Sequence, residues 1–173
     1  MKKFRRIKQI ANFSVEKRSV IEEIIGVELP KDLIYFICKN NAGLANSQCF
    51  QTEGGDIILF GRVFDFEDPM DSKESPFSCY NSFKNRIPKG LFPFAEEPSG
   101  DIYCFGKPKE SEDSKKGIYY HYHEGKVLNN RENKFKTIFL FNSITQLVDR
   151  LKNCEEFEDD SYDDLEDIFP GLT

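Results

Sequence analysis

The sequence predicts a single α+β domain in which helices pack against a mostly antiparallel β-sheet. Two amphipathic helical segments stand together near the N-terminus, a long central region alternates short apolar runs with turn residues, and a further amphipathic segment follows near the C-terminus. Two helices at the start and one at the end, segregated from the strands, are typical of the α+β class. The chain has 173 residues, which suits one domain with short tails.

The first predicted helix covers residues 14–26. Ser14 is a suitable N-cap, Ile21 and Ile25 recur at helical spacing, and Gly26 can close the C-terminus. The second helix starts after Leu29-Pro30, because proline is tolerated at the first helical position. Residues 40–43, Asn-Asn-Ala-Gly, end it.

The central part of the chain has the composition of β-strands, because runs of β-branched and aromatic residues are bounded there by Gly, Pro or Asn. Glu124-Gly125 is a two-residue turn of the kind that joins hairpin strands. An intervening helix is predicted over 75–87, and the last helix follows the cap Ser143 with one apolar face ending at Leu151. The predicted strands are 48–52, 56–60, 90–95, 101–106, 117–123, 126–129 and 136–141.

Charge divides the chain into a basic segment (1–13), a domain (14–153) and an acidic tail (154–173). Residues 1–9 carry five basic groups, residues 155–173 carry nine acids and no base, and the net charge is −6. An acidic chain is poorly suited to a nucleic acid and better suited to a basic protein partner. The tail is predicted to be a disordered, solubilising segment, although its apolar residues leave open that it folds onto something.

The cysteines predict unlinked thiols in a reducing compartment, because their number is odd and none form a C-x-x-C pair. The chain has no apolar run of the roughly 20 residues that span a bilayer. The basic N-terminus also lacks the apolar core of a signal peptide. We therefore expect a cytoplasmic protein without membrane contact. The cysteines are Cys38, Cys49, Cys79, Cys104 and Cys154.

The order and spacing of several short motifs resemble the SUKH superfamily (SMI1/KNR4-like) over about residues 14–152. Each motif is weak alone, and the signal is their combination. The resemblance implies a scaffold whose loops and sheet recognise different proteins, with no catalytic motif; many bacterial members look like immunity proteins, and a yeast member regulates cell-wall assembly. The motifs are Leu29-Pro30, residues 40–43, Gly90-Leu-Phe-Pro-Phe-Ala95, residues 99–105, the aromatic run 117–123 and Ser143.

Two positions depart from the family pattern. The family usually closes the second helix with an Asn-Gly-Gly-like sequence, whereas Ala42 stands before Gly43 here. It often opens the final helix with Ser-Phe, whereas Ser143 is followed by Ile144. Neither change is expected to disturb the fold, because one left-handed position closes a helix and the second site needs only an apolar side chain.

Catalysis would have to use His121, His123, one of the five cysteines or a carboxylate pair. Cys104 could contact His121 or His123, because they lie on predicted neighbouring strands. Cys104 stands in an apolar run and is better interpreted as a core residue. His121 and His123 lack a local cysteine pair to complete a zinc site. We expect no enzyme activity, no metal and no cofactor.

The candidate binding surface is the acidic–aromatic stretch 53–74. Its acids would steer a basic protein partner toward the surface, and its aromatics would anchor the contact. An alternative is that Phe60 and Phe64 are core residues and the acids form a solvated loop. Glu96-Glu97 could extend the same negative surface. The predicted partner-binding residues are Glu53, Asp56, Phe64, Asp65, Phe66, Glu67, Asp68, Asp71, Glu96 and Glu97.

Charge and resemblance together predict an immunity protein that neutralises a cognate protein toxin by direct binding. A nuclease toxin fits, because a nuclease presents positive charge to its substrate. The alternative is an intracellular regulatory or scaffold module unrelated to toxins. The oligomeric state is left open.

Overall fold

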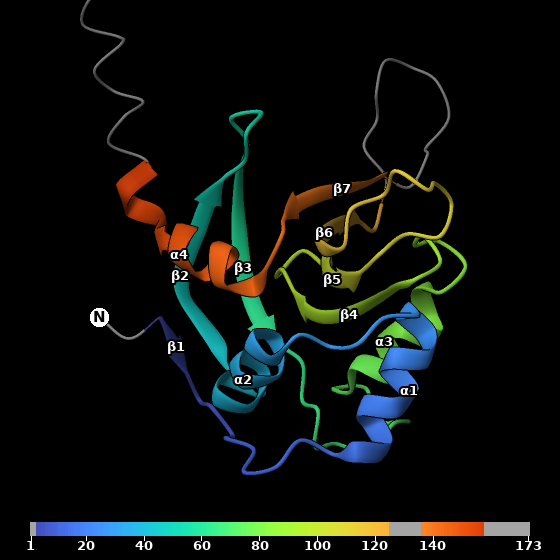
Figure 1. Ribbon diagram of the computed structural model, residues 1–173. Helices are drawn as coiled ribbons and strands as arrows, with labels where there is room; N and C mark the ends of the chain where they lie inside the picture. Colours follow the sequence, from blue (N-terminus) through green and yellow to red (C-terminus); the bar gives the residue numbers. More distant parts are fainter. Residues whose placement is uncertain (1–2, 125–135, 158–173) are drawn as a thin grey trace, which may run out of the picture.

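The computed structural model describes residues 3–124 and 136–157. Within them an eight-stranded sheet runs in the order β1-β2-β3-β4-β5-β6-β7, with β8 also paired to β2, and every pairing is antiparallel (Figure 1). The strands are β1 (Phe4–Arg5), β2 (Leu44–Gln51), β3 (Ile57–Val63), β4 (Leu91–Glu96), β5 (Ile102–Gly106), β6 (Gly117–Tyr122), β7 (Lys136–Phe141) and β8 (Lys152–Asn153).

The predicted α+β class is confirmed, since helices pack against this sheet. The predicted strand 126–129 and the turn at Gly125 lie outside the described residues. β1, β8 and the 3₁₀ helix were not predicted from the sequence. The helices are α1 (Val15–Ile25), α2 (Lys31–Asn40), α3 (Pro76–Phe83), α4 (Ile144–Arg150) and the 3₁₀ helix η1 (Cys154–Phe157).

Helix ends form at the residues that the sequence indicated. The Ser14 hydroxyl accepts a hydrogen bond from the Lys17 backbone N–H at 3.2 Å, and Gly26 closes α1 in the left-handed region. The Ser143 hydroxyl accepts from the Gln146 N–H at 3.3 Å and starts α4. These caps satisfy backbone groups that a helix end leaves without an intrahelical partner.

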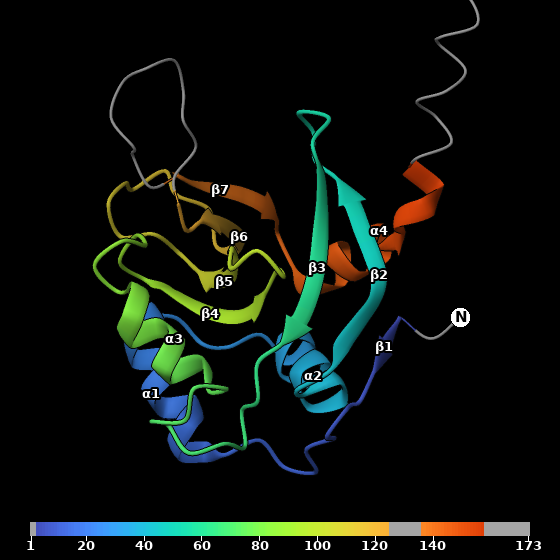
Figure 2. The same cartoon turned by 180° about the vertical axis from the view of Figure 1, so that it is seen from behind.

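The two faces of the sheet carry separate apolar clusters. Along β5, Tyr103 and Phe105 face the larger cluster, to which α1, α2 and α4 contribute, whereas Ile102 and Cys104 face a smaller one under α3. This alternation follows from the two-residue period of a strand. Figure 2 shows α3 on the side of the sheet opposite α2 and α4. Tyr103 is fully buried at the centre of the larger cluster.

The sheet splits between β3 and β4. These strands pair only at Arg62↔Glu96 and Val63↔Ala95, so the rest of β3 diverges with β2 as a projecting hairpin (Figures 1 and 2). The Tyr103 hydroxyl donates a hydrogen bond to the Leu59 carbonyl at 2.8 Å and links the two parts. Within residues 3–124 and 136–157, the divergence leaves the face of β2 and β3 that is turned away from the helices without a helix over it.

The prediction of five unlinked thiols is wrong. Cys49 and Cys154 form a disulfide, although 105 residues separate them. The reason is the pairing of β8 with β2, which places Lys152 opposite Cys49 and brings the next turn of chain against it. Sequence spacing does not reveal a contact of this kind. Cys38, Cys79 and Cys104 are free thiols.

Ordered structure extends on both sides of residues 14–153. Phe4 in β1 is buried, and its ring packs edge-on against Phe36 and Phe60. Ile10 is buried in the same cluster. At the other end the disulfide and η1 follow Asn153. Among the described residues no helix is long and apolar enough to cross a membrane.

Candidate protein-binding surface

The predicted acidic–aromatic stretch 53–74 does not form one surface, because β3 runs through it. The hairpin tip (residues 52–56) lies at one end of this seven-residue strand, and the loop 64–75 lies at the other. Seven strand residues span about 20 Å. Figure 1 shows the tip projecting from the molecule, whereas the loop descends between α2 and α1.

Phe64 and Phe66 belong to the core and not to a contact surface. Only 2% and 3% of these residues are exposed. The Phe66 ring packs against Phe13 with 5.6 Å between ring centroids. A side chain that is already buried offers no area to a partner, so both are removed from the candidate surface. The structure thus supports the alternative in which Phe60 and Phe64 are core residues, and Phe66 joins them.

Asp65 is likewise buried, and its carboxylate holds the loop in place. Its Oδ2 accepts a hydrogen bond from the Lys8 ammonium at 2.7 Å, and its Oδ1 accepts from the Asn41 amide at 2.8 Å and the Glu67 N–H at 3.0 Å. Burial alone would raise the pKa of Asp65, but these hydrogen bonds outweigh it and lower the pKa. Asp65 is therefore a structural residue.

The remaining loop acids divide into bound and exposed groups. The Asp68 carboxylate accepts from the Ser72 hydroxyl at 2.8 Å, and its carbonyl accepts from the Lys17 ammonium at 2.7 Å. Glu67 and Asp71 are exposed. Glu74 is exposed as well, but its carboxylate pairs with Arg62. This loop thus offers a partner three exposed carboxylates, of which Glu74 is already paired, and no exposed aromatic ring.

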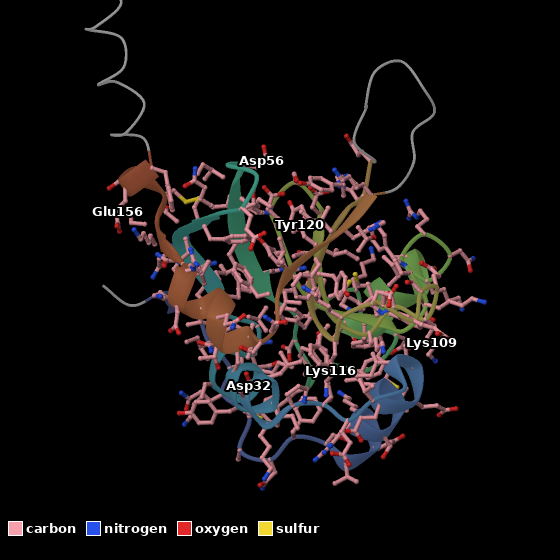
Figure 3. All side chains as sticks on the ribbon, turned by 45° about the horizontal axis from the view of Figure 1, so that its top comes forward. Asp32, Asp56, Lys109, Lys116, Tyr120 and Glu156 are labelled. Carbon is pink, nitrogen blue, oxygen red and sulfur yellow. A yellow bond between two sulfur atoms is a disulfide. The ribbon has the colours of Figure 1, made fainter. Side chains whose placement is uncertain are left out.

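The hairpin tip keeps the acidic character that the sequence predicted. Glu53 and Asp56 are exposed there, beside the exposed Ile57, of which 45% is accessible. Figure 3 shows Asp56 at the tip and Glu156 on η1 toward the same end of the molecule. The tip and η1 therefore form one acidic end.

A groove of about 380 Å³ lies on the uncovered face of β1–β3; we call it the outer groove. Its floor is largely apolar, and Glu96 and Pro98 line it from β4 and the turn that follows, so the predicted residue Glu96 lies at this groove. An apolar centre with a polar rim is the usual composition of a protein interface. The outer groove is lined by Arg5, Leu44, Ala45, Ser47, Leu59, Phe60, Gly61, Arg62, Glu96 and Pro98.

Arg62 links the outer groove to the rest of the fold. Its Nε donates to Glu96 at 2.5 Å, and its guanidinium also pairs with Glu74. Partial burial would lower the pKa of Arg62, but the two carboxylates outweigh it and raise the pKa. One cation is shared by two carboxylates, so this cluster remains negative. The neighbouring Glu97 accepts from the Ser99 N–H at 3.0 Å and fixes the following turn.

A second groove of about 460 Å³ continues from the outer groove between β1 and β8. Both grooves share Arg5, Ala45 and Ser47. Asn153 and Glu155 form its far wall, which the disulfide ties to β2. An uncovered surface therefore runs from the β4–β5 turn to η1.

Cys104 and His121, two of the residues considered for catalysis, are buried. Cys104 is fully buried, and burial raises the pKa of its thiol well above the ordinary value. His121 pairs with Ile102 in the strand register, diagonal to Cys104, and its Nδ1 lies 2.8 Å from the Thr137 hydroxyl. Burial lowers the pKa of His121 to about 4. A thiol without thiolate character is a poor nucleophile.

Asp101 organises the end of β6. Its carboxylate accepts from the Tyr120 hydroxyl at 2.9 Å and from the His123 backbone N–H at 2.8 Å, and it lies 2.7 Å from His123 Nδ1. Across residues 3–124 and 136–157, no cluster of three or more His, Cys, Asp or Glu is arranged to hold a metal ion. The absence of a metal cofactor stays a prediction.

The sequence did not indicate most of the groove. Ile57-Ile58-Leu59-Phe60 is apolar throughout, so alternation could not show that Leu59 faces outward while Phe60 faces the core. The regular two-residue alternation of a strand assigns these faces only when its buried side is known.

Comparison with known proteins identifies a family to which this chain belongs. No curated protein and no solved structure matches the chain. Residues 16–140 match the family SUKH_6, described as SMI1-KNR4 cell-wall. The matched segment begins in α1, ends in β7 and includes the whole β2–β6 sheet. The chain therefore belongs to the SUKH superfamily, in its SMI1-KNR4 cell-wall family.

Proposed function

We propose that the protein is a non-catalytic immunity protein that binds a cognate protein toxin with a basic surface and neutralises it by direct contact. The observation that carries this proposal is the outer groove, a sheet face with a largely apolar floor, charged side chains at its rim (Arg5, Arg62 and Glu96) and the acidic hairpin tip beyond it. Surfaces of this composition suit a protein partner: the apolar centre supplies affinity and the charged rim supplies steering and register.

Charge supports a basic partner. Glu53 and Asp56 stand at the hairpin tip, and Glu155 and Glu156 stand on η1, so exposed carboxylates gather at one end of the β2–β3 hairpin. A toxin that acts on nucleic acid must carry positive charge, and an acidic inhibitor can cover that charge. Long-range attraction of this kind raises the rate of encounter more than the final affinity.

The proposal of a non-catalytic protein rests on how the reactive side chains are used. Cys104 is buried under α3, and the Asp101 carboxylate accepts hydrogen bonds from the Tyr120 hydroxyl and the His123 backbone N–H. Membership of the family is equally compatible with an interaction module unconnected with toxins. That alternative predicts a partner but no protection of cells.

The test is protection of cells that express a toxin domain encoded beside this chain. Wild type should restore growth, and Leu59→Arg should abolish protection, because Leu59 faces outward and lines the outer groove, so the substitution places a cation on its apolar floor. Val15→Arg is the matched control, since Val15 is an exposed apolar residue of α1, 78% accessible and outside the outer groove. Loss of protection in both variants, or in neither while both fold, would contradict this surface. Failure of the wild type to protect would favour the interaction module.

A further inference from the structure

A pocket of about 310 Å³ lies at the C-terminal ends of α1 and α3, away from the outer groove. We call it the lysine pocket, because Lys84, Lys89 and Lys109 line it. Figure 3 shows Lys109 beside α1. Within the described part of the chain, no residue lining this pocket carries a carboxylate.

Two of the three lysines are joined by a backbone hydrogen bond, and the third stands at the end of α3. Lys84 is the C-cap of α3, and its N–H bonds to the Tyr80 carbonyl at 2.7 Å. The Lys109 N–H bonds to the Lys89 carbonyl at 2.9 Å, so these two residues lie side by side beyond the ends of β4 and β5. Lys109 also reaches over Gly26, where an added Cβ would meet its Cε at 3.3 Å.

The negative ends of α1 and α3 do not balance the positive charge of the three lysines. The C-terminus of a helix carries about −0.5 of an elementary charge, so α1 and α3 together offset about one of the three lysines. The pocket keeps about two positive charges in a protein whose net charge is −6. Like charges held together repel each other, and a bound anion would relieve that repulsion.

The remaining walls suit an organic group. Tyr80, Ile24 and Ile87 supply aromatic and apolar surface, and Asn85 supplies an amide that can donate and accept hydrogen bonds. The Tyr80 ring is backed by Phe92, with 5.5 Å between ring centroids. Ligand pockets are typically about 300–1,000 Å³ with a mostly apolar lining and few polar groups.

We propose that the lysine pocket binds a nucleoside phosphate. The phosphates lie among Lys84, Lys89 and Lys109, and the base packs against Tyr80. A protein surface rich in carboxylates would satisfy the lysines but leave the aromatic wall unused, which is why the smaller ligand is favoured. This site is separate from the outer groove and does not depend on toxin binding.

The test is isothermal titration of the full chain with ATP, and separately with inorganic tripolyphosphate, in low salt without magnesium. ATP should bind saturably at one site and more tightly than tripolyphosphate. The combined substitution Lys84→Ala, Lys89→Ala and Lys109→Ala should weaken ATP binding at least tenfold. The control combines Lys31→Ala, Lys73→Ala and Lys152→Ala, which removes the same charge from exposed positions outside the pocket, and should change affinity less than twofold.

Three outcomes would overturn the proposal: no saturable binding of ATP, equal weakening in both triple variants, or an octaglutamate peptide that binds as tightly as ATP. Tripolyphosphate binding as tightly as ATP would overturn the nucleoside assignment, since the aromatic wall would then contribute nothing. Each variant first has to show the melting temperature of the wild type within a few degrees. The readout is affinity alone, so a failure here leaves the toxin-binding proposal unaffected.

Discussion

The side-chain amide of Asn41 makes two hydrogen bonds: its Nδ2 donates to the Asp65 carboxylate at 2.8 Å, and its Oδ1 accepts from the Phe66 backbone N–H at 2.7 Å. One side chain at the end of α2 thus satisfies both a buried charge and a buried backbone donor. This pair, with Lys8, fixes the loop 64–75 against the helical layer. It explains why acids that the sequence suggested for binding serve the fold instead.

Replacing Asn41 should therefore destabilise the protein. Asn41→Ala is expected to lower the free energy of unfolding by about 2 kcal/mol or more, because hydrogen bonds to a buried charge are lost. Urea denaturation measures this, with Asn12→Ala at an exposed position as the control. The difference in stability between Asn41→Ala and the wild type should shrink in acid, because folding lowers the pKa of Asp65. The Asp65 carboxylate stabilises the fold fully above the ordinary pKa range of aspartate, and this stabilisation is lost as the pH falls through the pKa of Asp65 in the folded protein. Equal stability of the two variants at neutral pH would contradict this role.

Ala42 occupies the left-handed region with φ of +55°, whereas Gly43 does not. A residue with a Cβ is disfavoured there by about 1 kcal/mol or more. Ala42→Gly should raise the free energy of unfolding by about that amount. Gly43→Ala should do the opposite, because the added Cβ would lie 2.7 Å from the Asn40 carbonyl oxygen. Thermal melts of the two variants measure these effects. A lower melting temperature in Ala42→Gly would contradict the left-handed backbone conformation of residue 42. The structure thus explains why a Gly-Gly pair suits this helix end.

The Cys49–Cys154 disulfide should stabilise the purified protein. It closes a loop of about one hundred residues, and cross-links of this kind contribute about 2–4 kcal/mol. Reduction, or Cys154→Ser, should lower the melting temperature, whereas Cys38→Ser should leave its redox dependence intact. A chain ending at Phe157 should melt like the full chain under oxidising conditions, and one ending at Asn153 should melt like the reduced protein. Free thiols at both positions in protein purified under air would contradict the disulfide.

His121 should make stability depend on pH between about 6.5 and 4. Burial lowers its pKa from 6.5 to about 4, helped by Arg86 and His123 and opposed by Asp101. Below pH 6.5 the unfolded chain binds a proton that the folded protein does not, so stability falls as the pH drops toward 4. Melting temperatures across this range should fall less steeply in His121→Gln than in the wild type. Identical slopes would indicate that His121 is not held neutral.

Much of the fold could be predicted because its signals are local. Caps such as Ser14 and Ser143, and apolar spacing such as that of Ile21 and Ile25, are read within one helix and coincide with the observed helices. β1 and β8 escaped prediction because a two-residue strand has no periodicity and forms only when a distant strand accepts it. The disulfide depends on the same distant pairing.

The candidate surface was harder to predict, because neighbours in sequence need not share a surface. Glu53 and Asp65 stand in one acidic stretch, yet β3 separates them and only Glu53 is exposed. Composition also could not distinguish a ring that anchors a partner from a core ring, and Phe64 and Phe66 proved to be core rings. Of the predicted residues, the structure leaves Glu53, Asp56 and Glu96 at or beside the uncovered face of the sheet.

The most direct test of the proposed function is the association rate with the toxin domain, measured at several salt concentrations. Glu53→Lys combined with Asp56→Lys should slow association severalfold at low salt and flatten its salt dependence, because exposed charges act through long-range steering. Glu67→Lys combined with Asp71→Lys makes the same charge change on the exposed part of the loop 64–75 and should alter the rate far less. If the loop variant slows association and the hairpin variant does not, the toxin binds elsewhere and the account of the outer groove is wrong.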